Sequence, residues 1–230
     1  HALAVCEEII RRNLKLRFEV ELSPVGQDDD SVQLLKAAGC IGVDLTADSG
    51  SDRMLETLRR GFTADALDGV AKLYAKHSIP YTVGFLLGGP GEDRESLEAS
   101  IQLASRLPKM SSAYFTVGIL ILRHTDLLKI ALAEGVLASE DGLFRPTFYV
   151  SKSFDTQCAQ RLIDACQNHW RLYISDYFYT PLMKKFLKLA DWSNERPLWK
   201  HGATPKVVDK IFHLGRPSLR WDEARRCFVF

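Results

Sequence analysis

The residues most able to carry chemistry follow short apolar runs and comprise a carboxylate, a hydroxyl and several glycines. Asp48 and Ser49 follow one run, and a carboxylate placed there can accept hydrogen bonds from sugar hydroxyls. Gly88 and Gly89 follow another run, where glycines allow positive φ and let a ligand approach main-chain groups that can read an adenine edge. The pattern predicts a site for a small polar molecule.

Simpler interpretations of both turns remain open. Ser49 or Ser51 could merely cap a helix over Asp52–Arg60, and the glycines could form an ordinary tight turn. No Lys-Ser or Lys-Thr pair follows Gly91 and the GxGxxG spacing is not met, so the run is neither a P-loop nor a dinucleotide fingerprint.

Two further side chains are candidate substrate contacts. Glu21 alternates with Glu19 along one strand, so both face the same side, which is either the interior or an exposed sheet edge. His124 follows a long apolar run and could contact substrate or donate a proton, or be a surface histidine.

The elements that must position these residues alternate between amphipathic and β-branched segments, which predicts parallel β/α units. The strands are expected to be apolar on both faces and to gather ligands at their carboxyl ends. The expected helices are Ala2–Asn13, Ser31–Ala38, Thr63–His77 and Glu92–Leu107, and the expected strands are Arg17–Leu22, Ile41–Thr46, Tyr81–Leu87 and Ala113–Leu122.

This pattern predicts an α/β fold, a partial TIM-like (β/α) barrel whose N-terminal units are missing from the sequence. We expect the barrel part to span residues 1–143 and a mainly helical, aromatic-rich C-terminal region to span 144–230, with helix over Phe154–Leu189. The net charge of +1 gives no field for nucleic acid, and no apolar run is long enough to cross a membrane. The sequence is typical of a soluble cytoplasmic protein acting on a small molecule.

The five cysteines are scattered without CxxC or CxxxCxxC spacing, which favours buried thiols over a metal site. Cys158 and Cys166 lie two turns apart on an expected helix, where packing is the favoured role.

Three segments together resemble the second half of a radical S-adenosylmethionine (radical SAM) barrel. Residues 48–63 resemble the family's "ESGS…(K/R)G-T" stretch, 84–92 its "GFIxGLPGET" stretch, and 120–137 its sixth strand with "PGT…A…EGL". The resemblance covers roughly residues 1–140 and is nearest to members with a cobalamin-binding domain, such as the anaerobic magnesium-protoporphyrin cyclase group.

The resemblance implies that S-adenosylmethionine is reductively cleaved to a 5′-deoxyadenosyl radical by a [4Fe–4S] cluster bound to a CxxxCxxC loop in an absent N-terminal segment. Cobalamin is a further cofactor that it leaves open, for methyl transfer or rearrangement on an unactivated carbon. Asp48 and Ser49 would face the ribose or methionine end. Phe85, Leu86, Gly88 and Gly89 would flank the adenosine, and Arg60 occupies a basic position suited to a carboxylate.

The sequence departs from the family pattern at two places. Asp48 replaces the usual Glu, and Arg123-His124 replaces Pro-Gly. The alternatives are a β/α-barrel enzyme acting on a phosphorylated metabolite, with Gly88–Gly91 at a helix N-terminus, and a degenerate radical SAM-like binding module. Either way this chain alone should not generate radicals, and an opened barrel with bare strand edges should self-associate.

Overall fold

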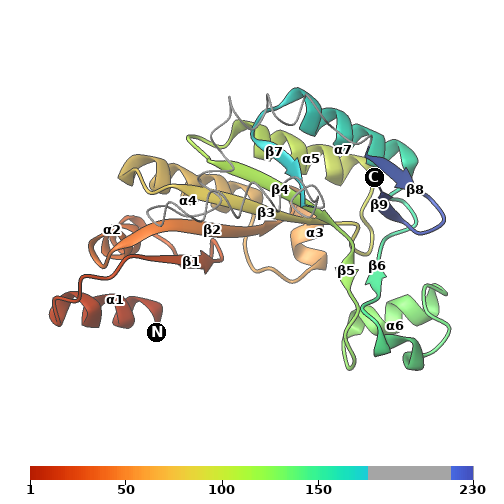
Figure 1. The fold of residues 1–230 in the computed structure, drawn as a ribbon, viewed down its shortest axis with the longest axis horizontal. Helices are drawn as coiled ribbons and strands as arrows, with labels where there is room; N and C mark the ends of the chain where they lie inside the picture. The colour runs from red at the N-terminus through yellow and green to blue at the C-terminus, as the bar shows by residue number, and fades with distance from the viewer. Residues whose placement is uncertain (176–218, 230) are drawn as a thin grey trace.

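A five-stranded parallel sheet forms the centre of the molecule (Figure 1). The computed structural model describes residues 1–175 and 219–229. In spatial order the strands are β1 (Phe18–Leu22), β2 (Cys40–Asp48), β3 (Tyr81–Leu87), β4 (Ser112–Val117) and β7 (Leu172–Ile174). The four predicted parallel units are therefore confirmed. The structure adds a fifth strand, β7, which has only three residues and was not predicted from the sequence.

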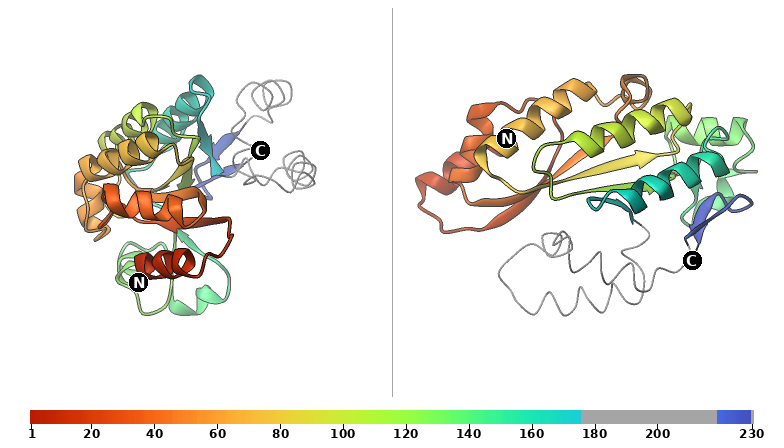
Figure 2. Two further views of the ribbon diagram at one scale, coloured as in Figure 1. Left: turned by 90° about the vertical axis from the view of Figure 1, so that its left-hand side faces the viewer. Right: turned by 90° about the horizontal axis from the view of Figure 1, so that it is seen from above.

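Helices cover one face of this sheet, where α2, α4, α5 and α7 follow one another (Figure 2). Asp28 and Asp93 each start a helix with a capping box, and Asp155 accepts a hydrogen bond from the Cys158 amide at the start of α7. The bounds are α1 (Ala2–Arg11), α2 (Asp29–Ala37), α3 (Asp52–Thr57), α4 (Ala64–His77), α5 (Arg94–Arg106) and α7 (Thr156–Asn168).

The main core lies between the sheet and these helices. Val43, Leu45 and Val83 are fully buried there, and Phe85 stacks on Phe115 at a centroid distance of 5.1 Å. The side chains of β2 that point to the opposite face of the sheet are polar and partly exposed; they are Asp44, Thr46 and Asp48. The expectation that both strand faces are apolar thus holds only under the helices, and we call the other face the inner face.

The predicted strand Ala113–Leu122 is wrong in its second half. At Gly118, with φ of 101°, the chain leaves the main sheet and β5 (Ile119–Leu120) pairs antiparallel with β6 (Phe148–Tyr149). With α6 (Asp126–Ala133) and η1 (Glu140–Phe144) these strands form an arm projecting from the end of the sheet (Figure 1). A small second core of Ile121, Leu128, Ala131, Leu137 and Tyr149 holds the arm together.

The expected domain boundary after residue 143 does not divide the core. Phe154, Leu162 and Ile174 belong to the same buried cluster as β2 and β3, because α7 and β7 extend the main sheet by one unit. The hairpin of β8 (Arg220–Asp222) and β9 (Cys227–Val229) packs Trp221 on Phe154 at 5.5 Å. The predicted helix over Phe154–Leu189 is wrong beyond Asn168, where α7 ends and the chain forms β7; residues 176–218 lie outside the described residues.

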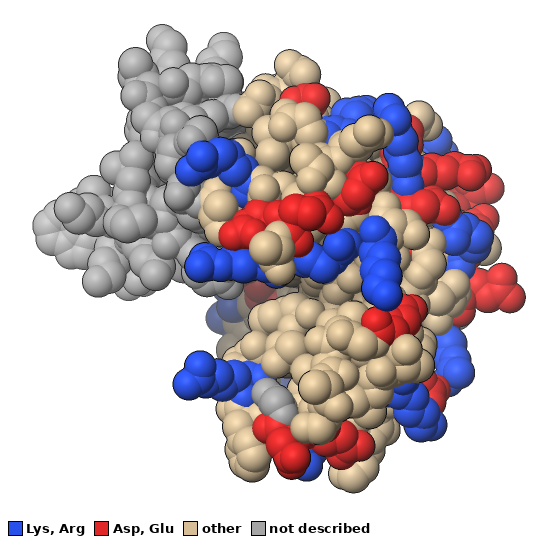
Figure 3. All heavy atoms as spheres, turned by 90° about the vertical axis from the view of Figure 1, so that its right-hand side faces the viewer, with Lys and Arg blue, Asp and Glu red and all other residues tan. Residues whose placement is uncertain are grey.

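Charge is mixed over the face that carries the arm, where acidic and basic side chains are interspersed (Figure 3). Within the described ranges, no helix has the length and hydrophobicity needed to cross a bilayer. Four of the five cysteines, Cys6, Cys40, Cys158 and Cys166, are buried, as predicted, and Cys227 is exposed.

Candidate functional site

Asp48 occupies an irregular position at the carboxyl end of β2. The register against β3 shifts between Thr46 and Asp48, and the Asp48 backbone has φ of 58°. A bulge of this kind redirects a side chain, and a positive φ outside glycine occurs most readily at Asn and Asp. The local geometry therefore aims the Asp48 carboxylate at the inner face.

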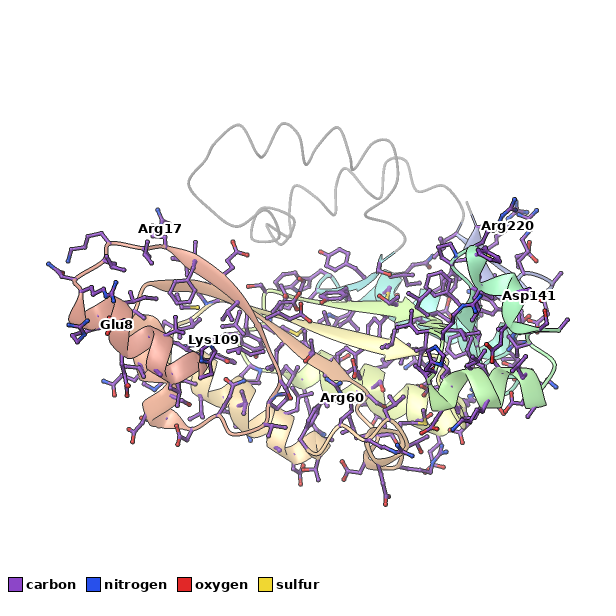
Figure 4. All side chains as sticks on the ribbon, turned by 90° about the horizontal axis from the view of Figure 1, so that it is seen from below. Glu8, Arg17, Arg60, Lys109, Asp141 and Arg220 are labelled. Atoms are coloured by element: carbon purple, nitrogen blue, oxygen red, sulfur yellow. The ribbon has the colours of Figure 1, made fainter. Side chains whose placement is uncertain are left out.

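There Asp48 meets a basic partner. Arg60 Nε lies 2.6 Å from Asp48 Oδ2, and an Arg60 terminal nitrogen lies 3.5 Å from the Thr46 hydroxyl. Arg60 sits beside the ends of the first two strands (Figure 4). Burial raises the pKa of Asp48, Arg60 opposes that shift, and Glu21 adds to it. Three predicted site residues, Asp48, Arg60 and Glu21, are thus brought together.

Ser49 faces away from this cluster. Its side chain is fully buried, its oxygen lies 3.3 Å from the Ser100 hydroxyl of α5, and it accepts a hydrogen bond from the Ser51 amide. The Gly50 amide also donates to Ser100, and a Cβ on Gly50 would lie 2.6 Å from the Ala99 carbonyl oxygen. Ser49 therefore fastens the turn to α5, and its predicted ligand contact would have to come from its main chain.

No serine hydroxyl caps the following helix, α3, as the sequence suggested that Ser49 or Ser51 could. Ser51 occupies the N-cap position of α3 without a side-chain cap bond. Asp52 instead accepts a hydrogen bond from the Ala64 amide, which ties α3 to the start of α4.

The glycine turn after β3 is held by the rest of the protein. Gly88 adopts φ of 81°, and its carbonyl accepts a hydrogen bond from the Ser151 amide at 2.8 Å. Gly89 has apolar neighbours, since a Cβ there would meet the ends of Ile119 at 3.2 Å and Met54 at 3.4 Å. The turn thus requires a small residue at Gly89 and presents an apolar flank beside it.

Glu92 closes the glycine turn from inside. It is fully buried, receives a hydrogen bond from the Ser96 hydroxyl, and has its pKa raised to about 7 by burial. The sequence analysis placed Glu92 only at the start of the expected helix Glu92–Leu107 and gave it no role in the site. Asp93 takes the exposed capping position, so Glu92 packs beneath the turn.

Arg53 joins the two turns. Its guanidinium donates to the Gly91 carbonyl at 2.8 Å and to the Asp93 carboxylate at 2.6 Å, from α3 to the segment before α5. The turns after β2 and β3 consequently form one connected edge, although about forty residues separate them in sequence.

The remaining predicted site residues, Phe85, Leu86 and His124, do not lie together. Phe85 is 1% exposed and stacked in the core, so only its main chain could flank a nucleoside, whereas Leu86 has the opposite parity and is partly exposed. His124 lies in the exposed turn before α6, with φ of 64°, on the arm and not at the end of a strand of the main sheet. The structure therefore does not bring His124 to the carboxyl edge with Asp48.

Three inner-face residues were overlooked. Tyr114 of β4 donates to Asp44 of β2 at 2.8 and 3.0 Å, and the Thr82 hydroxyl of β3 donates to Asp44 at 3.1 Å. The available signal was the polar period of two in β2, Asp44, Thr46 and Asp48, inside an otherwise apolar run.

The described residues contain no group of three or more His, Cys, Asp or Glu side chains able to hold a metal ion. The cysteines also lack the CxxxCxxC spacing anywhere in the sequence. A cluster bound by three thiolates therefore does not fit the described part of this chain.

Comparison with known proteins shows which families and proteins this chain resembles. Residues 2–104 match the model of the radical SAM superfamily. A tRNA-2-methylthio-N(6)-dimethylallyladenosine synthase from Ehrlichia ruminantium is 36% identical over 74 residues, 31% of this chain and 16% of that protein. An uncharacterized methyltransferase from Pyrococcus horikoshii is 32% identical over 103 residues, 45% of this chain and 22% of that protein.

A solved structure shares the fold over nearly the whole chain. The radical S-adenosylmethionine methyltransferase TsrM from Kitasatospora setae, bound to tryptophan and a SAM analogue, superposes with a TM-score of 0.73 at 20% identity. The alignment covers 93% of this chain and 51% of TsrM, so this chain spans about half of that protein. The fold is thus a partial (β/α) barrel, as predicted, and residues 2–104, which contain β1, β2 and β3, are similar to the radical SAM superfamily.

Proposed function

We propose that this chain forms the adenosine side of a radical SAM enzyme, with the turns after β2 and β3 holding S-adenosylmethionine. The observation that carries the proposal is the paired Asp48 and Arg60 beside the glycine turn, on one edge tied together by Arg53. A carboxylate suits ribose hydroxyls or an ammonium group, and a guanidinium suits a carboxylate. The donor set fits the cofactor.

Each part of the edge has a distinct task in this proposal. Asp48 binds and orients the polar end of the cofactor, and Arg60 supports the ionised form of Asp48 despite its burial. Leu58 and Ile119, which lie beside Gly89 and are partly exposed, offer an apolar surface for the adenine ring. When bound beside a [4Fe–4S] cluster, S-adenosylmethionine would supply a 5′-deoxyadenosyl radical.

The cluster would be held by cysteines outside these residues, and the inner face would receive the substrate. The reaction we propose is methyl transfer or rearrangement on an unactivated carbon, with cobalamin as a further cofactor; the names of the relatives, a methyltransferase and a methylthio-forming synthase, support the methyl transfer. TsrM, which shares the fold, has been solved with cobalamin and a [4Fe–4S] cluster bound.

The phosphate-binding alternative has an obstacle at the start of α5. The Asp93 carboxylate already accepts from the Ser96 amide there, and the Glu92 carboxyl lies directly behind it. The ionised Asp93 carboxylate therefore occupies the helix N-terminus and opposes a phosphate there.

The test uses the full-length protein, purified anaerobically with its cluster reconstituted. We expect dithionite and S-adenosylmethionine to yield 5′-deoxyadenosine by mass spectrometry. Calorimetric titration without reductant should show Asp48→Ala weakening S-adenosylmethionine binding by about ten-fold, as loss of a charge-assisted hydrogen bond predicts. Asp30→Ala, on an exposed turn of α2, is the matched control. Absence of both binding and cleavage would favour a degenerate module.

A further inference from the structure

A cavity opens on the inner face beside β4. It has a volume of about 930 Å³ and lies between the sheet, the arm and the β8–β9 hairpin. Its sheet side carries hydroxyls and one carboxylate, and its walls include apolar side chains from the arm and the hairpin. The lining residues used below are Asp44, Thr82, Tyr114, Val117, Phe148 and Phe228.

The carboxylate in this cavity is held in a fixed position. The Tyr114 hydroxyl, shared between the two Asp44 oxygens, and the Thr82 hydroxyl both donate to Asp44, which links three neighbouring strands. The Tyr114 ring crosses β3 over Gly84, where a Cβ would lie 2.6 Å from the Tyr114 hydroxyl. Gly84 is therefore a glycine because the tyrosine needs that space to reach Asp44.

The one carboxylate among the described lining residues of the cavity, Asp44, lies on its sheet side. Burial raises the pKa of Tyr114, and Asp44, Glu21 and Asp48 raise it further, so all three carboxylates act at this point. Two arginines of the hairpin also line the cavity, and both have partners of their own: Arg226 donates to the Ser151 and Phe154 carbonyls, and Arg225 pairs with Asp222 at 3.5 Å. Within the described ranges, no Lys, Arg or His forms an ion pair with Asp44.

We propose that this cavity selects a substrate with an ammonium group on an aromatic or other apolar body, with Asp44 accepting hydrogen bonds from the ammonium. An oriented carboxylate gives a directional contact for such a group, and Val117, Phe148 and Phe228 provide apolar surface for the rest. That the ligand is the substrate rests on the proposed function; the selectivity of the cavity does not.

The probes are tryptamine and indolepropionate, which share a ring and tether and differ in charge. They are titrated calorimetrically into the cluster-loaded full-length protein with S-adenosylmethionine and without reductant. We expect tryptamine to bind about ten-fold more tightly or better, and Asp44→Asn to remove that preference, as loss of a charged acceptor predicts. Asp30→Asn should leave both affinities unchanged.

Tyr114→Phe provides a second variant, since it keeps the ring over Gly84 but removes the hydroxyl that donates to the Asp44 carboxylate. It should weaken tryptamine binding several-fold without affecting indolepropionate. Equal affinity for the two probes, no binding of either, or a preference that survives Asp44→Asn in a protein with an unchanged melting temperature would overturn the inference. Selective tryptamine binding without S-adenosylmethionine cleavage would instead overturn the proposed function alone.

Discussion

Replacing Gly84 with alanine should destabilise the protein through one identifiable contact. The new Cβ would lie 2.6 Å from the Tyr114 hydroxyl, 2.7 Å from Cζ and 2.9 Å from Cε2. The ring cannot withdraw freely, because its hydroxyl donates to both Asp44 oxygens at 2.8 and 3.0 Å. Either the overlap stays or the hydrogen bonds break, and each costs about 1–3 kcal/mol.

The assay is urea denaturation of a double-mutant cycle. Gly84→Ala alone should lower the free energy of unfolding by about 1–3 kcal/mol. In a Tyr114→Ser background the obstruction is gone, so the same change should be neutral or slightly stabilising. The coupling between the two positions should then be about 1 kcal/mol or more.

Gly69→Ala is the matched control, since nothing lies within 4 Å of its added Cβ on α4. An alanine there should stabilise the helix by about 0.5–1 kcal/mol. A neutral Gly84→Ala in the unmodified protein, or an equal cost in both backgrounds, would refute the account of Gly84.

Two further outcomes are expected. Because burial raises the pKa of Glu92 to about 7 from 4.5, the folded protein favours the protonated carboxyl, so stability relative to Glu92→Gln should fall as pH rises from 4.5 through 7. Urea titrations at several pH values measure this, and a pH-independent difference would contradict it. The isolated 230-residue chain should self-associate, because β1 is the outermost strand of the described sheet and Leu3, Val5 and Leu14 are exposed; a clean monomer in sedimentation at high concentration would count against this.

Much of the scaffold could be predicted because its signals are local. The acidic caps at Asp28, Asp93 and Asp155, together with the apolar runs after each helix, lie within a few residues of the elements they define. The same locality explains the errors. At Gly118 a single apolar run leaves the main sheet and enters the small sheet of β5 and β6. Only the neighbours of Gly118 in space, Phe148 and Val150, reveal this change.

The candidate site was also only partly predictable from the sequence. The order of the residues was enough to place Asp48 and Gly88 at strand ends, since in parallel β/α units every strand ends at one edge. It could not show that Ser49 turns toward α5 while Asp48 turns toward the inner face, because a register shift between Thr46 and Asp48 decides this.

By itself, then, the sequence determined the β/α order, the superfamily resemblance and the edge where a ligand would bind, because these depend on periodicity and on motifs short enough to read along the chain. Only the tertiary structure decided which polar side chains share the inner face. Asp44 and Tyr114 are seventy residues apart, and their hydrogen bonds exist because β3 lies between their strands and has no side chain at Gly84.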